Sequence, residues 1–178
     1  MSAPAHAPAA TGGHGFRPDE AVPLIDEREL ASAAGNAACV LFTGPLHART
    51  LALRIHSLSG WRWGPFLCVD CGAPASVLER DLFSVLTADL VAASASSARV
   101  LQGGTLFLEE VGKLRADAQA RLRELLAQRG ELGRRPQLRI MASTSEPLLP
   151  RIKAATFDAH LFYRLNVLHF VLPGEGGG

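Results

Sequence analysis

The chain has 178 residues, of which 48% are hydrophobic, and its formal net charge is +1. This length and composition are sufficient for one domain with a full hydrophobic core, and the near-neutral charge gives no support for direct binding to DNA or to an acidic membrane surface. No apolar run approaches the roughly 20 residues that a membrane-spanning helix requires, and the N-terminus lacks the pattern of a secretion signal. We therefore expect a cytoplasmic protein.

In chain order, the composition predicts a disordered leader, one folded domain and a flexible tail. Residues 1–18 are rich in Ala, Pro, Gly and His and have no periodicity, which is typical of disorder. Residues 19–173 mix helical and strand-like patterns and are predicted to form one α/β domain. The tail, residues 174–178, contains four glycines.

Within the domain, helices and strands alternate, which predicts a mostly parallel sheet with right-handed crossovers. The predicted elements are, in order, helix 19–34, strand 38–43, helix 48–58, strand 65–70, a helix starting at residue 74, strand 105–108, helix 114–128, strand 138–143, helix 157–166 and strand 167–172. Residues 87–97 are predicted to be weakly structured, and residues 130–136 to form a turn. The arginines of helix 114–128 are interpreted as a solvated face; they are Arg115, Arg121, Arg123 and Arg129.

The three cysteines, Cys39, Cys68 and Cys71, are an odd number in a chain without a secretion signal, which argues against disulfides. Cys68 and Cys71 have CxxC spacing, but no second pair and no histidine cluster accompany them. We therefore predict no zinc site and interpret both residues as small buried apolar side chains at a strand end.

Residues 103–112 combine a strand with two adjacent carboxylates. Thr105 to Leu108 is apolar and β-prone, as expected for a central parallel strand. Glu109 and Glu110 follow at its carboxyl end, where open α/β sheets bind their ligands. In P-loop nucleotide hydrolases one acid at this position holds Mg²⁺ and the next orients the attacking water. A solvated acidic turn without any ligand is the alternative interpretation.

Residues 44–51 lie where a phosphate-binding loop of pattern G-x-x-x-x-G-K-[ST] belongs. Gly44 is present, but the second glycine and the lysine are missing, and Pro45 removes one backbone N–H from the phosphate cradle. Arg49 and Thr50 take the places of the Lys-Thr pair if one loop residue is deleted, although a forked guanidinium is a poor replacement for an ammonium. We therefore expect no tight binding of ATP.

Two stretches of the chain resemble one known family, the central AAA+ ATPase domain of bacterial sigma-54-dependent transcription activators. The family has G-G-T-L-F-L-D-E-I-G where this chain has residues 103–112, and F-R-x-D-L-Y-Y-R-L-N-V where it has residues 157–167. The resemblance covers roughly residues 22–173. It implies a three-layer P-loop NTPase sandwich of the AAA+ type around a mostly parallel five-stranded sheet, and we expect the family's helical lid domain to be lacking.

The resemblance also implies roles for individual residues. Glu110 matches the family's catalytic glutamate, whereas Glu109 replaces the aspartate that holds Mg²⁺ and adds one methylene where metal geometry is strict. Ser145 stands at the asparagine that senses the γ-phosphate. Arg164 matches one of two arginines that act as fingers across the subunit interface, while Asp158 replaces the other and reverses its charge.

Two parts of the family's machinery are altered or missing. Its phosphate loop, G-E-S-G-T-G-K-E, corresponds to residues 44–51, of which Gly44, Arg49 and Thr50 remain as candidates for binding a nucleotide. Its G-A-F-T-G-A loop, which engages sigma-54, is missing between Phe83 and Gly103. We therefore expect no metal and no bound cofactor, with ATP and Mg²⁺ as the alternative.

The sequence supports two principal hypotheses about function. The first is a non-catalytic pseudo-ATPase that binds a protein, either an intact AAA+ transcription activator or a second copy of itself, without direct DNA binding or a membrane. The second is a slow nucleotide-binding enzyme that uses Arg49, Thr50, Glu109, Glu110 and Arg164. A gene product with no selected role is a third possibility.

Overall fold

The structure is a computed structural model that describes residues 25–45, 47–94, 103–131 and 138–173. It contains one sheet whose strands pair in parallel in the order β2-β3-β4-β1-β5. The strands are β1 (Val40–Thr43), β2 (Phe66–Asp70), β3 (Gly104–Glu109), β4 (Leu138–Thr144) and β5 (Leu168–Val171). The helices are α1 (Glu27–Gly35), α2 (Ala48–Leu58), α3 (Ala75–Leu78), α4 (Ser84–Ser94), α5 (Ala116–Glu131), α6 (Leu149–Lys153) and α7 (Ala159–Leu165), with a π-helical turn η1 (Glu79–Phe83) and a 3₁₀ turn η2 (Val111–Lys113).

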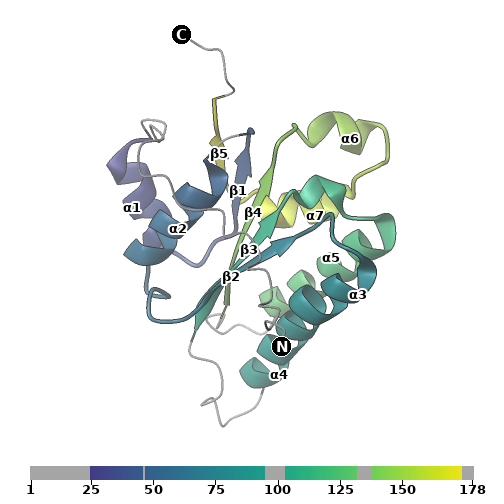
Figure 1. Cartoon of the computed structure of the whole chain (residues 1–178), viewed down its shortest axis with the longest axis horizontal. Helices are drawn as coiled ribbons and strands as arrows, with labels where there is room; N and C mark the ends of the chain where they lie inside the picture. Colours follow the sequence, from purple (N-terminus) through teal and green to yellow (C-terminus); the bar gives the residue numbers. More distant parts are fainter. Residues whose placement is uncertain (1–24, 46, 95–102, 132–137, 174–178) are drawn as a thin grey trace, which may run out of the picture.

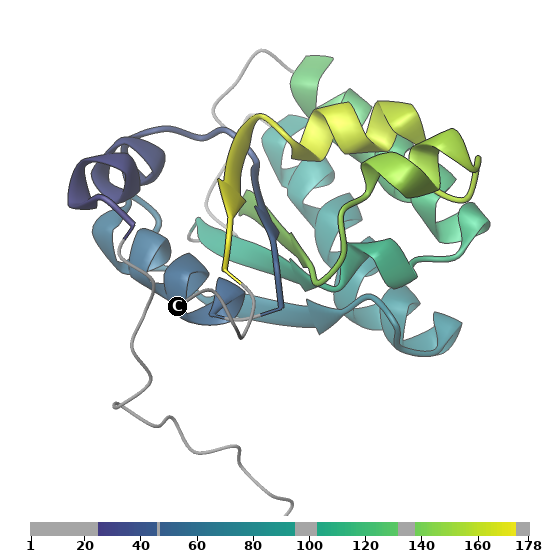
Figure 2. The same cartoon turned by 90° about the horizontal axis from the view of Figure 1, so that it is seen from above.

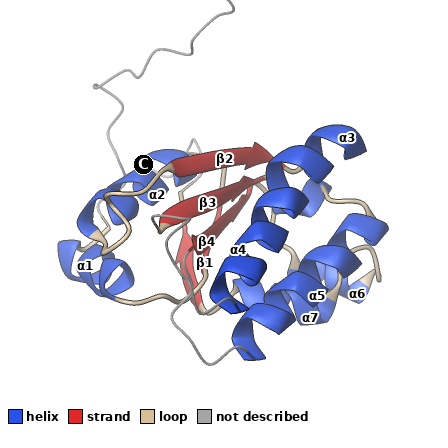
Figure 3. Ribbon diagram, turned by 90° about the horizontal axis from the view of Figure 1, so that it is seen from below, coloured by secondary structure: helices blue, strands red, loops and turns tan. Residues whose placement is uncertain are grey.

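The elements form three layers. Helices α1 and α2 cover one face of the sheet, and α3, α4, α5 and α7 cover the other (Figures 1 and 3). The view from above in Figure 2 shows the same separation, with the sheet between the two groups of helices. This arrangement confirms the predicted three-layer α/β architecture and its parallel five-stranded sheet.

Burial on both faces explains why the middle of each central strand is apolar, although β4 also buries Arg139, which donates to the carbonyl oxygen of Ala33. Every residue of β4 is buried, and β3 is buried from Gly104 to Leu108. Alternate residues of these strands contribute to two separate cores: Leu106 and Ile140 face the α3–α7 layer, whereas Phe107 and Met141 face α1 and α2. Side chains alternate between the faces of a strand, so one apolar run supplies both cores.

Most element boundaries agree with the sequence prediction. Helix α2 covers residues 48–58 as predicted, and the strand boundaries differ from the predicted ones by at most two residues. Helix α1 begins at Glu27, later than predicted, because the Asp26 carboxylate accepts the amide of Arg28 as an N-cap. The predicted leader and tail, and residues 19–24 of the predicted first helix, lie outside the described residues.

The prediction of weak structure after residue 86 is wrong for residues 87–94, which continue helix α4. Alanine is the best helix former, and the helix is held to the layer beneath it by the buried side chains of Leu86 and Asp89. The predicted turn is also wrong at its start, since Gly130 and Glu131 belong to α5. Helix α6 was not predicted at all.

The interpretation of the α5 arginines as a solvated face is wrong for Arg129, which is only 8% exposed and forms an ion pair with the buried Asp89 at 2.8 Å. Arg121 instead pairs with Glu79, and Arg123 with Asp158. None of the helices in the described residues is long and apolar enough to cross a membrane.

Candidate functional site

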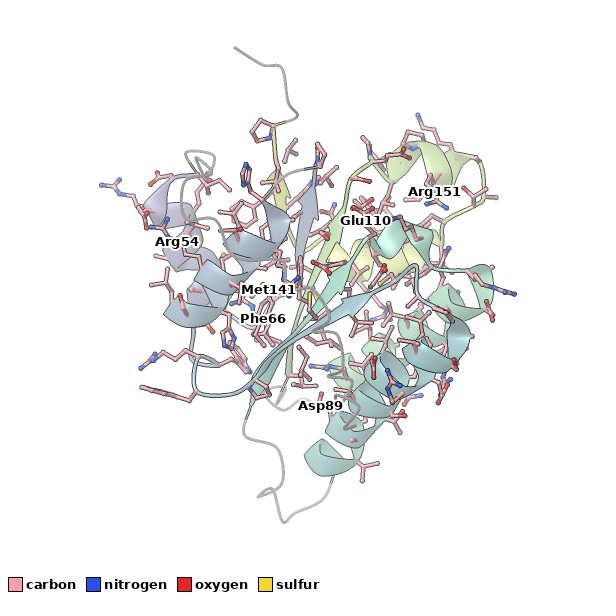
Figure 4. All side chains as sticks on the ribbon, viewed as in Figure 1. Arg54, Phe66, Asp89, Glu110, Met141 and Arg151 are labelled. Carbon is pink, nitrogen blue, oxygen red and sulfur yellow. The ribbon has the colours of Figure 1, made fainter. Side chains whose placement is uncertain are left out.

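The carboxyl ends of the parallel strands border a cavity of about 400 Å³, which we call the strand-end cavity. It is lined by Gly44, Pro45, His47, Ala48, Arg49, Thr50, Asp70, Glu109, Glu110, Lys113 and Ser143. Glu110 lies at this upper end of the sheet in Figure 4, whereas Asp89 lies at the opposite end. Five of the predicted site residues therefore meet in one place, as expected for ligand sites of open α/β sheets.

The turn between β1 and α2 forms one wall of this cavity. Gly44 has a φ of 138°, and a Cβ at this position would come within 2.4 Å of the carbonyl oxygen of Leu172. His47 has a φ of 65° and precedes α2 without a side-chain cap. Because no side chain caps the first turn of α2, its backbone N–H groups are available on the side where Arg49 and Thr50 line the cavity.

Glu109 has partners within the chain that compete with any metal. The guanidinium of Arg49 lies 3.9 Å from its carboxylate, and the side chains are 62% and 31% exposed. The thiol of Cys68 also hydrogen-bonds Glu109; burial, followed by this hydrogen bond and the negative charge of Glu109, raises the pKa of Cys68 to about 12. A thiol with this pKa stays protonated at neutral pH. Glu109 therefore has one cationic and one hydrogen-bonding partner within the chain.

Glu110 is held by Ser145. Its backbone is left-handed, with φ 54° and ψ 51°, a conformation that is uncommon for residues other than glycine. One carboxylate oxygen of Glu110 accepts hydrogen bonds from the backbone N–H of Ser145 at 3.2 Å and from its hydroxyl at 2.9 Å. The structure thus brings the predicted catalytic acid and the predicted sensor residue into direct contact, although Ser145 does not itself line the cavity.

Sequence reasoning missed two charged residues of the cavity. Asp70 follows strand β2 and contributes a third carboxylate, and Lys113 contributes an ammonium from the turn after β3. The search for a phosphate-binding lysine was confined to residues 44–51, but the parallel sheet also brings the residues after β3 to this edge. Lys113 follows Glu110 by three residues, and that spacing was the available signal.

The strand-end cavity contains three carboxylates, from Asp70, Glu109 and Glu110. Within the described residues, no three His, Cys, Asp or Glu side chains are placed so that they could hold one ion. Magnesium requires near-ideal octahedral oxygen geometry, and the acid at the expected position already faces Arg49. Arg49 would therefore compete with a cation for Glu109, and the absence of a resident metal stays a prediction.

Arg164 lies far from this cavity. It lines a different cavity of about 390 Å³ at the amino ends of β1 and β4, together with Cys39, Arg129 and Val167. The structure therefore does not join Arg164 to the other predicted site residues of the same chain. Asp158 has a structural role, because its carboxylate accepts the amide of Leu161 at 2.8 Å as the N-cap of α7 and pairs with Arg123 at 2.7 Å.

Curated relatives of the chain are bacterial transcription regulators. The sigma-54-dependent transcriptional activator SfnR of Pseudomonas putida is 37% identical over 151 residues, which cover 78% of this chain and 41% of SfnR. The regulatory protein AtoC of Escherichia coli is 34% identical over 158 residues, which cover 82% of this chain and 34% of AtoC. The chain thus spans less than half the length of these two relatives.

Solved structures share the fold. The ATP complex of NtrX from Brucella abortus superposes with a TM-score of 0.64 at 24% identity, over 82% of this chain and 35% of NtrX. The P-loop NTPase domain of a sigma-54 activator from Escherichia coli superposes with a TM-score of 0.56 at 21% identity, over 82% of this chain and 91% of that domain. The family model of the sigma-54 interaction domain matches residues 27–171. The chain therefore belongs to the sigma-54 interaction domain family, whose P-loop NTPase fold it shares.

Proposed function

We propose that the chain is a non-catalytic, pseudo-ATPase member of this family that acts in transcription regulation by binding another protein. One observation carries the proposal: Arg49, the only cation of the former phosphate loop, lies 3.9 Å from Glu109, the acid at the magnesium position. The group expected to hold phosphate and the group expected to hold metal therefore face each other. Phosphoryl transfer depends on such groups for electrostatic stabilisation, and a ligand would have to compete with this contact.

Isothermal titration with Mg·ATP tests the loss of nucleotide binding. We expect no binding tighter than about 1 mM for the unaltered chain. The variant Glu109→Gln removes the acid that faces Arg49 and should raise the affinity for Mg²⁺-free ATP, because the guanidinium is released. In a working magnesium site the same substitution would instead weaken the binding of Mg·ATP.

The matched variants Arg49→Ala and Arg54→Ala show whether any nucleotide binding that is observed takes place in the strand-end cavity. Both arginines are exposed residues of α2, but Arg54 pairs with Glu27 and does not line the cavity. Micromolar binding of Mg·ATP that Arg49→Ala abolishes and Arg54→Ala preserves would overturn the proposal.

The protein-binding half of the proposal concerns the surface around Arg164. Arg164 has no ion-pair or hydrogen-bond partner for its guanidinium within the described residues, and Tyr163 and Val167 beside it are 70% and 58% exposed. A large exposed aromatic side chain next to an arginine is typical of the residues that dominate protein interfaces. We propose an intact AAA+ activator, or a second copy of this chain, as the partner.

Co-purification of the tagged chain with an intact sigma-54-dependent activator, with and without nucleotide, tests this surface. Arg164→Glu should abolish the complex, whereas Lys153→Glu, an equal charge reversal at an exposed position of α6, should preserve it. Sedimentation of the chain alone tests self-association with the same two variants. Failure of both associations in every nucleotide state counts against the proposal.

A specific observation favours the second candidate, a weak ATP-binding domain. The uncapped first turn of α2, Thr50 and the ammonium of Lys113 line the same cavity as Glu110, and a helix N-terminus with nearby cations is a general anion site. The NtrX neighbour was solved in complex with ATP. The titration above separates the two candidates.

A further inference from the structure

A second cavity lies beside the strand-end cavity, between the α3–η1 segment and the start of α5. Its volume is about 280 Å³, and we call it the side cavity. The two cavities share Lys113 in their linings. The side cavity is close to the lower size limit of small-molecule pockets, and nothing in the proposed function uses it.

The floor of the side cavity is apolar. It includes Leu78, Phe83 and Ala118, whose side chains are at most 9% exposed. The π-helical turn places Glu79 at the rim and Phe83 in the floor, and insertions of this kind often occur at functional sites. An aromatic or aliphatic group that entered the cavity would be removed from water there.

At the rim of the side cavity, positively charged side chains outnumber negatively charged ones by one. Arg121 pairs with Glu79 through two hydrogen bonds, and Arg115 lies 3.5 Å from Asp117. These two pairs balance, which leaves the ammonium of Lys113 without an ion pair among the described residues. Asp70, on the other side of Lys113, already accepts the amide of Gly72 at 2.8 Å.

Gly72 leaves room for Lys113. A Cβ at Gly72 would come within 3.1 Å of the Lys113 Cδ, so a larger residue here would push the lysine stem away from the rim. Lysine is also rare in this chain: of the 18 lysine and arginine residues, only Lys113 and Lys153 are lysines.

We propose that the side cavity is a binding site for a small monoanion with an apolar body, such as an aromatic or short aliphatic carboxylate. The apolar part occupies the floor at Leu78 and Ala118, beside the Phe83 ring that the Arg121 guanidinium covers at 4.4 Å, and the carboxylate accepts hydrogen bonds from the ammonium of Lys113. The single surplus charge of the rim selects a monoanion over a neutral or cationic analogue of the same shape. The site shares Lys113 with the strand-end cavity, so a nucleotide bound there would compete with the monoanion for this ammonium.

Titration of the ¹⁵N-labelled chain with benzoate, followed by NMR, tests this site. We expect saturable shifts at the amides of Gly72 and Lys113, with a Kd on the order of 1 mM, and much weaker shifts with benzyl alcohol. Lys113→Met should weaken the binding of benzoate about tenfold, as expected for the loss of a charged hydrogen bond. Lys153→Met, at the other lysine, should leave it unchanged.

A second variant tests the position of the ligand. Ala75→Leu adds a side chain at an exposed position of the cavity lining and should prevent the shifts caused by benzoate. Three results overturn the proposal: an absence of saturable shifts at Gly72, equal binding of benzoate by the Lys113→Met or the Ala75→Leu variant, or shifts confined to Gly44 and Thr50, which would put the anion in the strand-end cavity.

Discussion

The buried ion pair between Asp89 and Arg129 connects α4 to α5 and to the start of β4. The side chains are 2% and 8% exposed. One carboxylate oxygen of Asp89 lies 2.8 Å from Arg129, and the other accepts the amide of Leu138 at 3.1 Å. Arg129 in turn donates to the carbonyl oxygen of Leu138. The substitution Asp89→Ala would remove the ion-pair partner of a buried guanidinium and the acceptor of the buried Leu138 amide.

We expect Asp89→Ala to lower the free energy of unfolding by about 3–5 kcal/mol, the usual cost of leaving one partner of a buried ion pair uncompensated. The total stability of a domain is only about 5–15 kcal/mol. For a chain of this size each kcal/mol corresponds to roughly 2–4 °C, so the Tm should fall by about 6–20 °C. Urea denaturation monitored by circular dichroism at pH 7 measures the change.

The pair as a whole should contribute far less than this cost. Burial raises the pKa of Asp89 above its usual value, and the opposing attraction of Arg129 does not compensate for the lost hydration. The double variant Asp89→Leu with Arg129→Met should therefore be much more stable than Asp89→Ala alone. Asp81→Ala is the control, because Asp81 forms an exposed pair with Arg80 and its loss should hardly change the Tm. The reasoning is refuted if Asp89→Ala behaves like Asp81→Ala, or if the double variant is as unstable as the single one.

Three further predictions concern the backbone, a histidine and a thiol. Gly44→Ala should destabilise the fold by about 1–3 kcal/mol in urea denaturation, because φ is 138° and the new Cβ would meet the Leu172 carbonyl. Burial, followed by the positive charge of Arg139, lowers the pKa of His56. Below about pH 6.5 the unfolded chain therefore binds a proton at His56 that the folded chain does not, so the free energy of unfolding should fall as the pH falls. The variant His56→Asn should reduce this pH dependence. Because the pKa of Cys68 is raised to about 12, its alkylation at pH 8, followed by peptide mass spectrometry, should be slow and should accelerate in the Glu109→Gln variant.

The parts of the fold that depend on local pattern could be predicted from sequence. Helix α2 was predicted with its observed ends, since its apolar side repeats at helical spacing between a glycine-proline turn and Ser59. Strand β3 was recognised as central because Thr105 to Leu108 is apolar and β-prone, as expected for a strand covered on both faces. The same topology explains the partial success at the site: consecutive parallel strands end at one edge, so the residues after β1 and β3 had to meet.

What was missed depends on contacts between distant parts of the chain. Arg129 has the spacing of an exposed helix residue, and only its position opposite Asp89, 40 residues earlier, makes it buried. Helix α4 carries alanine and serine where a regular amphipathic pattern would have revealed it, and its hold on α5 comes from that same ion pair. Lys113 was overlooked for a similar reason, because its place in the cavity is set by the sheet, which brings the residues after β3 to this edge.

The charges of the strand-end cavity also bear on how the domain folds without a ligand. A site built for a metal and a triphosphate would leave its cations and carboxylates unpartnered when empty, and unpartnered charges at partly buried positions reduce stability. Here Arg49 faces Glu109, Ser145 donates to Glu110 and the amide of Gly72 donates to Asp70, so all three carboxylates have partners from the chain itself. The compensation lies in side chains at the ends of strands, while the apolar residues of β3 and β4 hold the sheet together behind them. The described residues of the turn between β1 and α2 are not part of either core, so the proposed protein-binding role would not require a phosphate-binding loop for the fold to persist.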